Sequence, residues 1–195
     1  KKYLLAFELE KVQQHENMAV FPILCSLDHS PRYITLKEAI ERRVLVITEI
    51  DQGGSVPHLK VINKGDVAVL LLDGEELTGA KQNRVLNTTI LVKENSEIII
   101  PVSCTEQGRW SYVSHEFRES GALMNPSIRG MKAETVARSL AFDMDFRSDQ
   151  GAVWNAIQNL NGEAEGRFET GAMHDAFKSK GKDIESYLEA FECLE

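Results

Sequence analysis

The sequence predicts an α+β fold, with an antiparallel β-meander or sandwich-like core in the first half and helices in the second half. Three observations support this prediction: alternating apolar residues near the start, short turns between apolar runs from residue 59 to residue 103, and helical periodicity in the last third. We expect one domain over residues 1–195, β-rich over residues 1–113 and helical over residues 120–195. The chain begins at Lys1 and ends within a helical pattern, so we expect it to be part of a longer chain.

Local patterns predict the first elements. Residues 3–9 alternate between apolar and polar side chains, as a half-buried strand does. Residues 18–24 form a second extended run that a proline interrupts, which indicates an edge strand or a bend. Thr35 and Glu38 have the spacing of a capping box, so a short helix is expected there, followed by a strand over residues 44–50.

Two turns organise the predicted meander. Residues 63–66 (Asn-Lys-Gly-Asp) and residues 93–96 (Lys-Glu-Asn-Ser) each separate two apolar runs. Asn and Gly tolerate a positive φ, and short connections of this kind join antiparallel neighbours because parallel strands need long crossovers. We therefore expect a hairpin at each turn and an antiparallel sheet over residues 59–103.

The helical segments come after the strands. Apolar residues follow a rough helical period over residues 128–140 and a better one over residues 153–160, where Ser148 or Asp149 would be the N-cap. Residues 184–191 carry the clearest amphipathic pattern, with apolar side chains at i, i+3, i+4 and i+7. Strands first and helices later favour α+β over a doubly wound sheet.

Composition excludes several function classes. The net charge is −8, with 22 Lys and Arg against 30 Asp and Glu, which disfavours nucleic acid as a partner. No apolar run approaches the roughly 20 residues that span a bilayer, so no membrane partner is expected. Cys25, Cys104 and Cys193 form no CxxC pair, which argues against a disulfide framework and favours the cytoplasm. The five histidines form no metal motif, and the sequence indicates no particular cofactor.

Polar residues crowd two segments of the predicted meander, residues 74–87 and residues 104–110. If residues 94–95 form a two-residue turn, Val85 lies opposite Cys104 and the two segments meet at one end of the hairpin, within about one residue of register. Together they would provide an anion-binding side, an acidic side and a stacking surface. The residues that would form this site are Glu75, Glu76, Lys81, Gln82, Asn83, Arg84, Asn87, Cys104, Glu106, Arg109 and Trp110.

A structural interpretation of the same residues stays open beside the functional one. Asn, Gln, Glu and Arg often hold turns and strand ends through bonds to the backbone. Trp110 fits a core position as well as a stacking surface. Cys104 fits a small buried hydrophobe as well as a nucleophile.

Four segments of the sequence resemble one known family. They are residues 15–22 (His-Glu-Asn-Met-Ala-Val-Phe-Pro), residues 33–39 (Tyr-Ile-Thr-Leu-Lys-Glu-Ala), residues 74–87 and residues 101–110. This prokaryotic family is named for its association with ADP-ribosylglycohydrolases and rhodanese-phosphatases. The resemblance spans roughly residues 15–140, is most specific over residues 74–87, and implies a genomic neighbourhood of ADP-ribose or phosphate chemistry.

Two functional hypotheses follow. In the first, the chain holds a nucleotide-like or ADP-ribose-type ligand: Lys81, Arg84 or Arg109 meets the phosphate, Trp110 stacks, and the glutamates of the two segments bind hydroxyls or act as acid and base. Whether the chain catalyses a reaction is left open. In the second, it is a non-enzymatic interaction module whose helices form a partner surface or a homo-oligomer surface.

Overall fold

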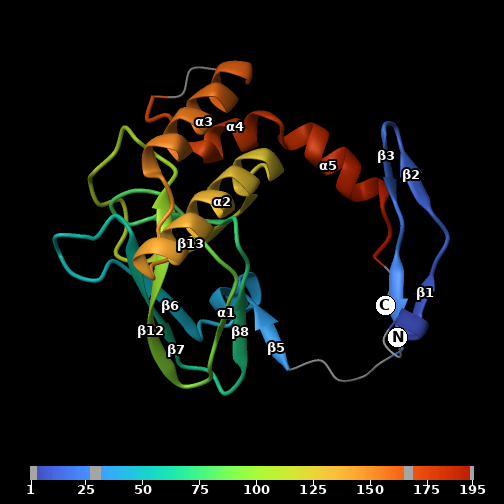
Figure 1. Ribbon diagram of the computed structural model, residues 1–195, viewed down its shortest axis with the longest axis horizontal. Helices are drawn as coiled ribbons and strands as arrows, with labels where there is room; N and C mark the ends of the chain where they lie inside the picture. Colours follow the sequence, from blue (N-terminus) through green and yellow to red (C-terminus); the bar gives the residue numbers. More distant parts are fainter. Residues whose placement is uncertain (1–3, 27–31, 165–168, 194–195) are drawn as a thin grey trace. The chain divides into compact units, whose positions relative to one another are not determined.

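The computed structural model describes residues 4–26, 32–164 and 169–193, and these residues form two compact units (Figure 1). The first unit combines residues 1–31 with residues 180–195, and the second comprises residues 32–179. The prediction of a single domain over residues 1–195 stays a prediction. All the residues that were predicted to form a site belong to the second unit.

The first unit is a β-ribbon with one helix. Its antiparallel strand pairs are β1 (Phe7–Leu9) with β4 (Ile23–Cys25) and β2 (Gln13–His15) with β3 (Met18–Val20). The predicted first strand is shorter than expected because Leu4–Ala6 is a 3-10 helix, and residue 3 lies outside the described residues. The predicted bend separates β3 from β4. The predicted last helix is confirmed as α5 (Gly181–Ala190), where the Tyr187 hydroxyl donates to Asn17 Oδ1 at 2.6 Å.

A curled six-stranded sheet forms the centre of the second unit, and every neighbouring pair in it is antiparallel. An isolated β-bridge joins Thr48, at the end of one edge strand, to Glu116, the residue before the other edge strand. The strands in sheet order are β13 (Phe117–Leu123), β9 (Glu75–Gly79), β10 (Arg84–Leu86), β12 (Ser96–Cys104), β7 (His58–Asn63) and β6 (Leu45–Thr48). A smaller sheet contains β11 (Ile90–Val92), β8 (Ala68–Leu71) and β5 (Tyr33–Thr35), the last pair being parallel.

The hairpin predicted at residues 63–66 is wrong in its pairing, whereas the one predicted at residues 93–96 is confirmed in part; the region is antiparallel as expected. β7 pairs with β12 rather than with β8, because the buried side chain of Asn63 turns the chain from one sheet to the other. Its Nδ2 donates to the carbonyls of Val67 at 2.9 Å and Lys93 at 3.0 Å. The run predicted over residues 85–92 breaks after Leu86, so β10 pairs with β12 while β11 joins β8.

The helix α1 (Leu36–Glu41) begins at the predicted capping box. Glu38 N donates to Thr35 Oγ1 at 3.3 Å, and Thr35 N donates to Glu38 Oε2 at 2.8 Å. Leu36 and Ala39 of this helix are buried among the apolar side chains of the two sheets. The larger of the two described cores therefore lies between the curled sheet, the smaller sheet and α1.

Three helices cover the outer face of the sheet: α2 (Pro126–Asp143), α3 (Gln150–Glu163) and α4 (Met173–Ser179) (Figure 1). Their apolar side chains form a second core around Val85 of β10. The predicted N-cap is confirmed as Asp149, whose Oδ1 accepts from Ala152 N at 3.0 Å. The α+β prediction is confirmed, but strand β13 was missed by a boundary set at residue 113. Within the described residues, no helix combines the length and the apolar composition that a membrane span requires.

Candidate functional site

The strands of the curled sheet bring several chain segments together at one end. Arg84, at the start of β10, lies opposite both Leu77 of β9 and Cys104, at the end of β12. Phe117, at the start of β13, lies opposite Gly79, at the end of β9. We call this end the sheet mouth. Mouths of curled and closed sheets are a frequent place for ligand sites, because several loops meet there over one scaffold.

The two polar segments meet at the sheet mouth, as predicted. Thr105 N donates to the carbonyl of Asn83 at 3.0 Å, and Asn83 N donates to Glu106 Oε2 at 3.2 Å. The register differs by one residue from the predicted one, since Arg84 rather than Val85 lies opposite Cys104. Residues directly opposite each other in an antiparallel pair share a face, so Arg84 lies on the inner face with Leu77.

Arg84 forms a buried ion pair with Glu49, a residue that the sequence did not single out. Nη2 of Arg84 lies 3.6 Å from Glu49 Oε1, and the two side chains are 0% and 3% exposed. Nη1 of Arg84 donates to the carbonyl of Gln82 at 2.9 Å. In contrast, Nε and Nη2 of Arg84 and both oxygens of Glu49 have no hydrogen-bond partner among the described residues. Burial lowers the pKa of Arg84, while Cys104 and Glu49 act in the opposite direction.

Cys104 lies beside this ion pair and is fully buried. Burial raises the pKa of its thiol to about 11, an effect that Arg84 reduces and Glu49 increases. The side chain is therefore a neutral thiol near pH 7, and the interpretation as a small buried hydrophobe is favoured over that of a nucleophile.

The guanidinium group of Arg109 is bonded to other groups of the protein. Its Nη2 lies 2.6 Å from Glu106 Oε2, and its Nη1 donates to the carbonyls of Ala80 at 2.8 Å and Ser111 at 2.9 Å. Burial alone would raise the pKa of Glu106, but hydrogen bonds from Arg109, Thr170 and the backbone of Asn83 hold it below its ordinary value. This pair clamps the turn between β9 and β10, in agreement with the structural interpretation.

Trp110 covers the sheet mouth and is 48% exposed. Its ring lies 5.6 Å from Arg84 Cζ and 5.3 Å from Lys81 Nζ, so two cations contact one indole. Lys81 Nζ also donates to the carbonyl of Gly53 at 2.6 Å, which ties it to the loop between β6 and β7. Gly54 in this loop has a φ of +78°, and a Cβ there would lie 3.4 Å from the Trp110 ring.

A pocket of about 420 Å³ opens beside Trp110, within the size range of small-molecule sites. Trp154 of α3 provides a second indole, and its Nε1 is buried without a hydrogen-bond partner among the described residues. The helical periodicity suggested only a core position for Trp154, so its place in this pocket could not be predicted from the sequence. The lining residues are Val56, Gln82, Gln107, Gly108, Arg109, Trp110 and Trp154.

Of the eleven predicted site residues, Gln82, Arg109 and Trp110 line this pocket. Three others are engaged elsewhere in the fold. Glu76 faces the helices, where its Oε1 accepts from Thr105 Oγ1 at 2.8 Å and its Oε2 lies 3.4 Å from His174 Nδ1. Glu75 accepts from Leu72 N at 2.8 Å, and burial raises its pKa. Asn87 donates to the carbonyl of Phe146 at 2.9 Å. These contacts hold local turns and fasten the helices to the sheet.

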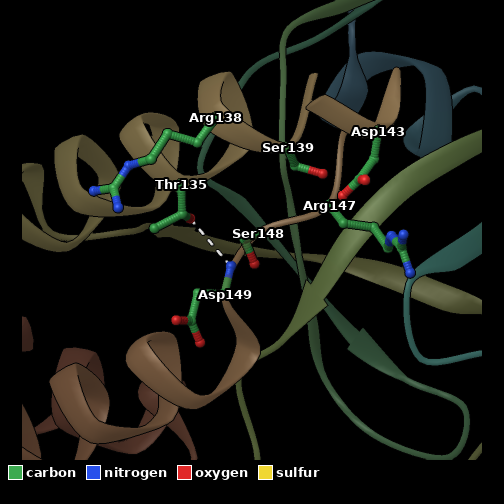
Figure 2. A pocket seen from close by; sticks show the side chains of 7 residues that line it. All are labelled: Thr135, Arg138, Ser139, Asp143, Arg147, Ser148 and Asp149. Atoms are coloured by element: carbon green, nitrogen blue, oxygen red, sulfur yellow. Dashed lines mark hydrogen bonds between the residues drawn. The ribbon is translucent and has the colours of Figure 1, made fainter. Parts of the chain in front are cut away.

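A second pocket, of about 360 Å³, lies between the end of α2 and the start of α3 (Figure 2). Figure 2 shows the side chains of Arg138 and Arg147 pointing away from each other. Each pairs with a neighbouring carboxylate, Arg138 with Glu134 at 2.8 Å and Arg147 with Asp145 at 2.6 Å. The two arginines therefore do not converge on a common anion.

Histidine, cysteine and carboxylate side chains form no group of three or more that could hold a metal ion, within residues 4–26, 32–164 and 169–193.

The chain was compared with protein-family models, curated proteins and solved structures. Residues 6–195 match the family model described as the ARG and Rhodanese-Phosphatase-superfamily-associated Protein domain, a longer range than the residues 15–140 that carry the resemblance. No curated protein and no solved structure matches the chain.

Proposed function

The chain belongs to the family of the ARG and Rhodanese-Phosphatase-superfamily-associated Protein domain, and we propose that its sheet mouth binds a nucleotide-like ligand of the ADP-ribose type. The observation that carries this proposal is the presence of Trp110 and Trp154 in one pocket of about 420 Å³. Two indoles in one small pocket suit a flat aromatic ring, since stacking on an aromatic side chain contributes about 1–3 kcal/mol per base.

The polar groups of the pocket fit the edges of a base. Nε1 of Trp154 is a buried donor that lacks an acceptor among the described residues, and a ring nitrogen or carbonyl of a base would supply one. The Gln107 side chain accepts from Gln158 Nε2 at 3.1 Å and retains its own amide donors for a ligand. Gln82, by contrast, is engaged with Glu106 and Arg84.

Lys81 supplies positive charge beside Trp110. In the part of the chain that the structure describes, its Nζ contacts the Gly53 carbonyl and the rings of Trp110 and Tyr112 rather than a carboxylate. The phosphate of a nucleotide whose base stacks on Trp110 would therefore meet a cation that no carboxylate among the described residues neutralises. This feature favours nucleotides over uncharged aromatic ligands.

Cys25, Cys104 and Cys193 are free thiols, which suits the reducing cytoplasm where such ligands are abundant.

Isothermal titration with ADP-ribose, ADP and adenosine tests this proposal. We expect wild-type protein to bind ADP-ribose and ADP, and both Trp110→Leu and Trp154→Leu to weaken binding by at least tenfold. Arg138→Ala, in the second pocket, is the matched control and should bind as the wild type does. Ligands that leave the heat signal and the melting temperature unchanged at millimolar concentration would refute the proposal, since a ligand at 100 times its Kd adds about 2.7 kcal/mol of stability.

A second candidate, the interaction module, is favoured by a different observation. Phe142 and Met144, at the end of α2, are 85% and 83% exposed. Large exposed apolar side chains that lie close together are typical of protein–protein contacts. If α2 forms a homo-oligomer surface, Phe142→Asp should lower the mass measured by light scattering to that of a monomer. A wild-type protein that is already monomeric at 100 μM would exclude that form of the module.

A further inference from the structure

We propose that Arg84 is the anion-binding residue of the sheet mouth and that Glu49 is an internal competitor, which occupies Arg84 until a phosphate group of the ligand replaces it. This inference rests on the proposed nucleotide site and names the charge that the site selects. Its basis is one buried ion pair whose hydrogen bonds are incomplete.

The unpartnered atoms of Arg84 lie on one edge of its guanidinium group. Nη1 is engaged with Gln82 and with the carbonyl of Asn83 at 3.3 Å. Nε and Nη2 have no hydrogen-bond partner among the described residues. The N–H groups on these two nitrogens are parallel, and together they form the fork that takes a carboxylate or a phosphate in a bidentate manner.

Glu49 does not fill this fork. Its Oε1 stays 3.6 Å from Nη2, which is longer than a hydrogen bond, and neither of its oxygens has another partner among the described residues. Both side chains are almost fully buried, so water makes up little of this deficit. A buried ion pair stabilises a protein only when its remaining polar atoms are also satisfied. The pair is therefore a weak competitor for a phosphate that can reach both donors.

The route to Arg84 leads past Trp110. This ring lies 5.6 Å from Arg84 Cζ, and Trp110 lines the pocket and is 48% exposed, so the same side chain borders both the pocket and the guanidinium group. The neighbouring loop also approaches Glu49, since a Cβ on Gly54 would lie 3.4 Å from Glu49 Oε2. A change in the Trp110 rotamer and a small shift of this glycine-containing loop would expose both members of the pair together.

The chemistry of the exchange is a replacement of one oxyanion by another. The phosphate takes the Nε and Nη2 donors of Arg84, and Glu49 turns toward the space that the loop leaves. Lys81 Nζ lies 5.3 Å from the same indole and adds a second positive charge for a diphosphate. The selected ligand class is thus a nucleotide with at least one phosphate next to the ring-bearing part.

The test is the ratio of the adenosine Kd to the ADP Kd, measured by isothermal titration. Glu49→Gln removes the competing charge and keeps the shape of the side chain, so the ratio should rise about tenfold, the effect of one additional charge-assisted hydrogen bond. Arg84→Lys keeps the charge but removes the fork, so the ratio should fall by at least tenfold. Arg138→Gln is the control and should keep the wild-type ratio.

The outcomes separate the two proposals. An unchanged or lower ratio in Glu49→Gln, or an unchanged ratio in Arg84→Lys, would overturn the role of Arg84 while the nucleotide site stands. If neither adenosine nor ADP binds any variant, the nucleotide proposal fails. A thermal-shift measurement with pyrophosphate then tests separately whether Arg84 binds an anion. A thermal shift with pyrophosphate that is larger for Glu49→Gln than for the wild type, and absent in Glu49→Gln/Arg84→Met, supports the anion site. Equal shifts in all three proteins would overturn it.

Discussion

Oε2 of Glu106 accepts two hydrogen bonds from Arg109, from Nε at 2.9 Å and from Nη2 at 2.6 Å. The same oxygen accepts from Asn83 N, so one carboxylate connects the turn after β9 with the turn after β12. Glu106 and Arg109 therefore form a well-bonded ion pair that stabilises the loops of the sheet mouth. Arg84 and Glu49, in contrast, form a buried ion pair with polar atoms that lack hydrogen-bond partners among the described residues.

We expect Arg109→Ala to lower the free energy of unfolding by about 3 kcal/mol, because it leaves the Glu106 carboxylate buried without its counter-charge. Urea denaturation followed by circular dichroism measures this change. Arg138→Ala removes an exposed i, i+4 ion pair and should cost less than about 1 kcal/mol. Equal losses in the two variants would mean that Arg109 contributes no more than a surface arginine.

The stability that Glu106 contributes should depend on pH. Its pKa is lowered in the folded protein, so its contribution is complete above the pKa of the unfolded chain, about 4.3, and is lost as the pH falls through the lower folded value. The difference in urea midpoint between wild type and Glu106→Gln should therefore be constant from pH 7 to pH 5 and shrink below about pH 4. A difference that does not change down to pH 2.5 would contradict this assignment.

Cys104 should resist alkylation in the native protein. It is fully buried and burial raises its pKa to about 11, so almost no thiolate forms near pH 8. Cys25 and Cys193 are exposed and should react with iodoacetamide first. Mass spectrometry should then find two labels on the native chain and three in urea. Three labels acquired at one rate under native conditions would show that Cys104 is accessible.

The capping box of α1 offers a local test of stability. Thr35→Ala removes the acceptor for Glu38 N and should lower the free energy of unfolding by about 1 kcal/mol. Thr35→Ser keeps the hydroxyl and should stay within a few tenths of a kcal/mol of the wild type, as measured by urea denaturation. Similar losses in both variants would point to the missing methyl group rather than to the cap.

The features that the sequence predicted well depend on residues close together in the chain. The capping box at Thr35 and the N-cap at Asp149 need only a few neighbouring residues, and both are present. The meeting of residues 74–87 with residues 104–110 was also predicted, since the strands before and after the 93–96 turn carry them to the same end. The sequence could not distinguish the role of Arg84 from that of Arg109. The two side chains differ in how many of their N–H donors are bonded to other groups of the folded protein, and this depends on tertiary structure.

The missed features depend on distant parts of the chain. Glu49 and Trp154 reach the sheet mouth only through tertiary packing, and nothing near them in the sequence signals this. The end of strand β10 at Leu86 was not predicted, because Thr88 and Thr89 have good strand propensity and suggest that the strand continues. Strand β13 was hidden for another reason: Gly121 has a φ of +77° and the register shifts between Glu119 and Leu123, which disturbs the alternation of a regular strand.

The bridge between Thr48 and Glu116 also determines when the curled sheet can close during synthesis of the chain. The edge strand β6 is made early, but its sheet closes only after β13 has left the ribosome. Until then β6 and β9 present unpaired N–H and C=O groups, which are templates for pairing with other chains. Pairings between distant segments also slow folding, because the intervening chain must be ordered first. A nascent chain that stalls before Phe117 thus keeps these strand edges open to aggregation.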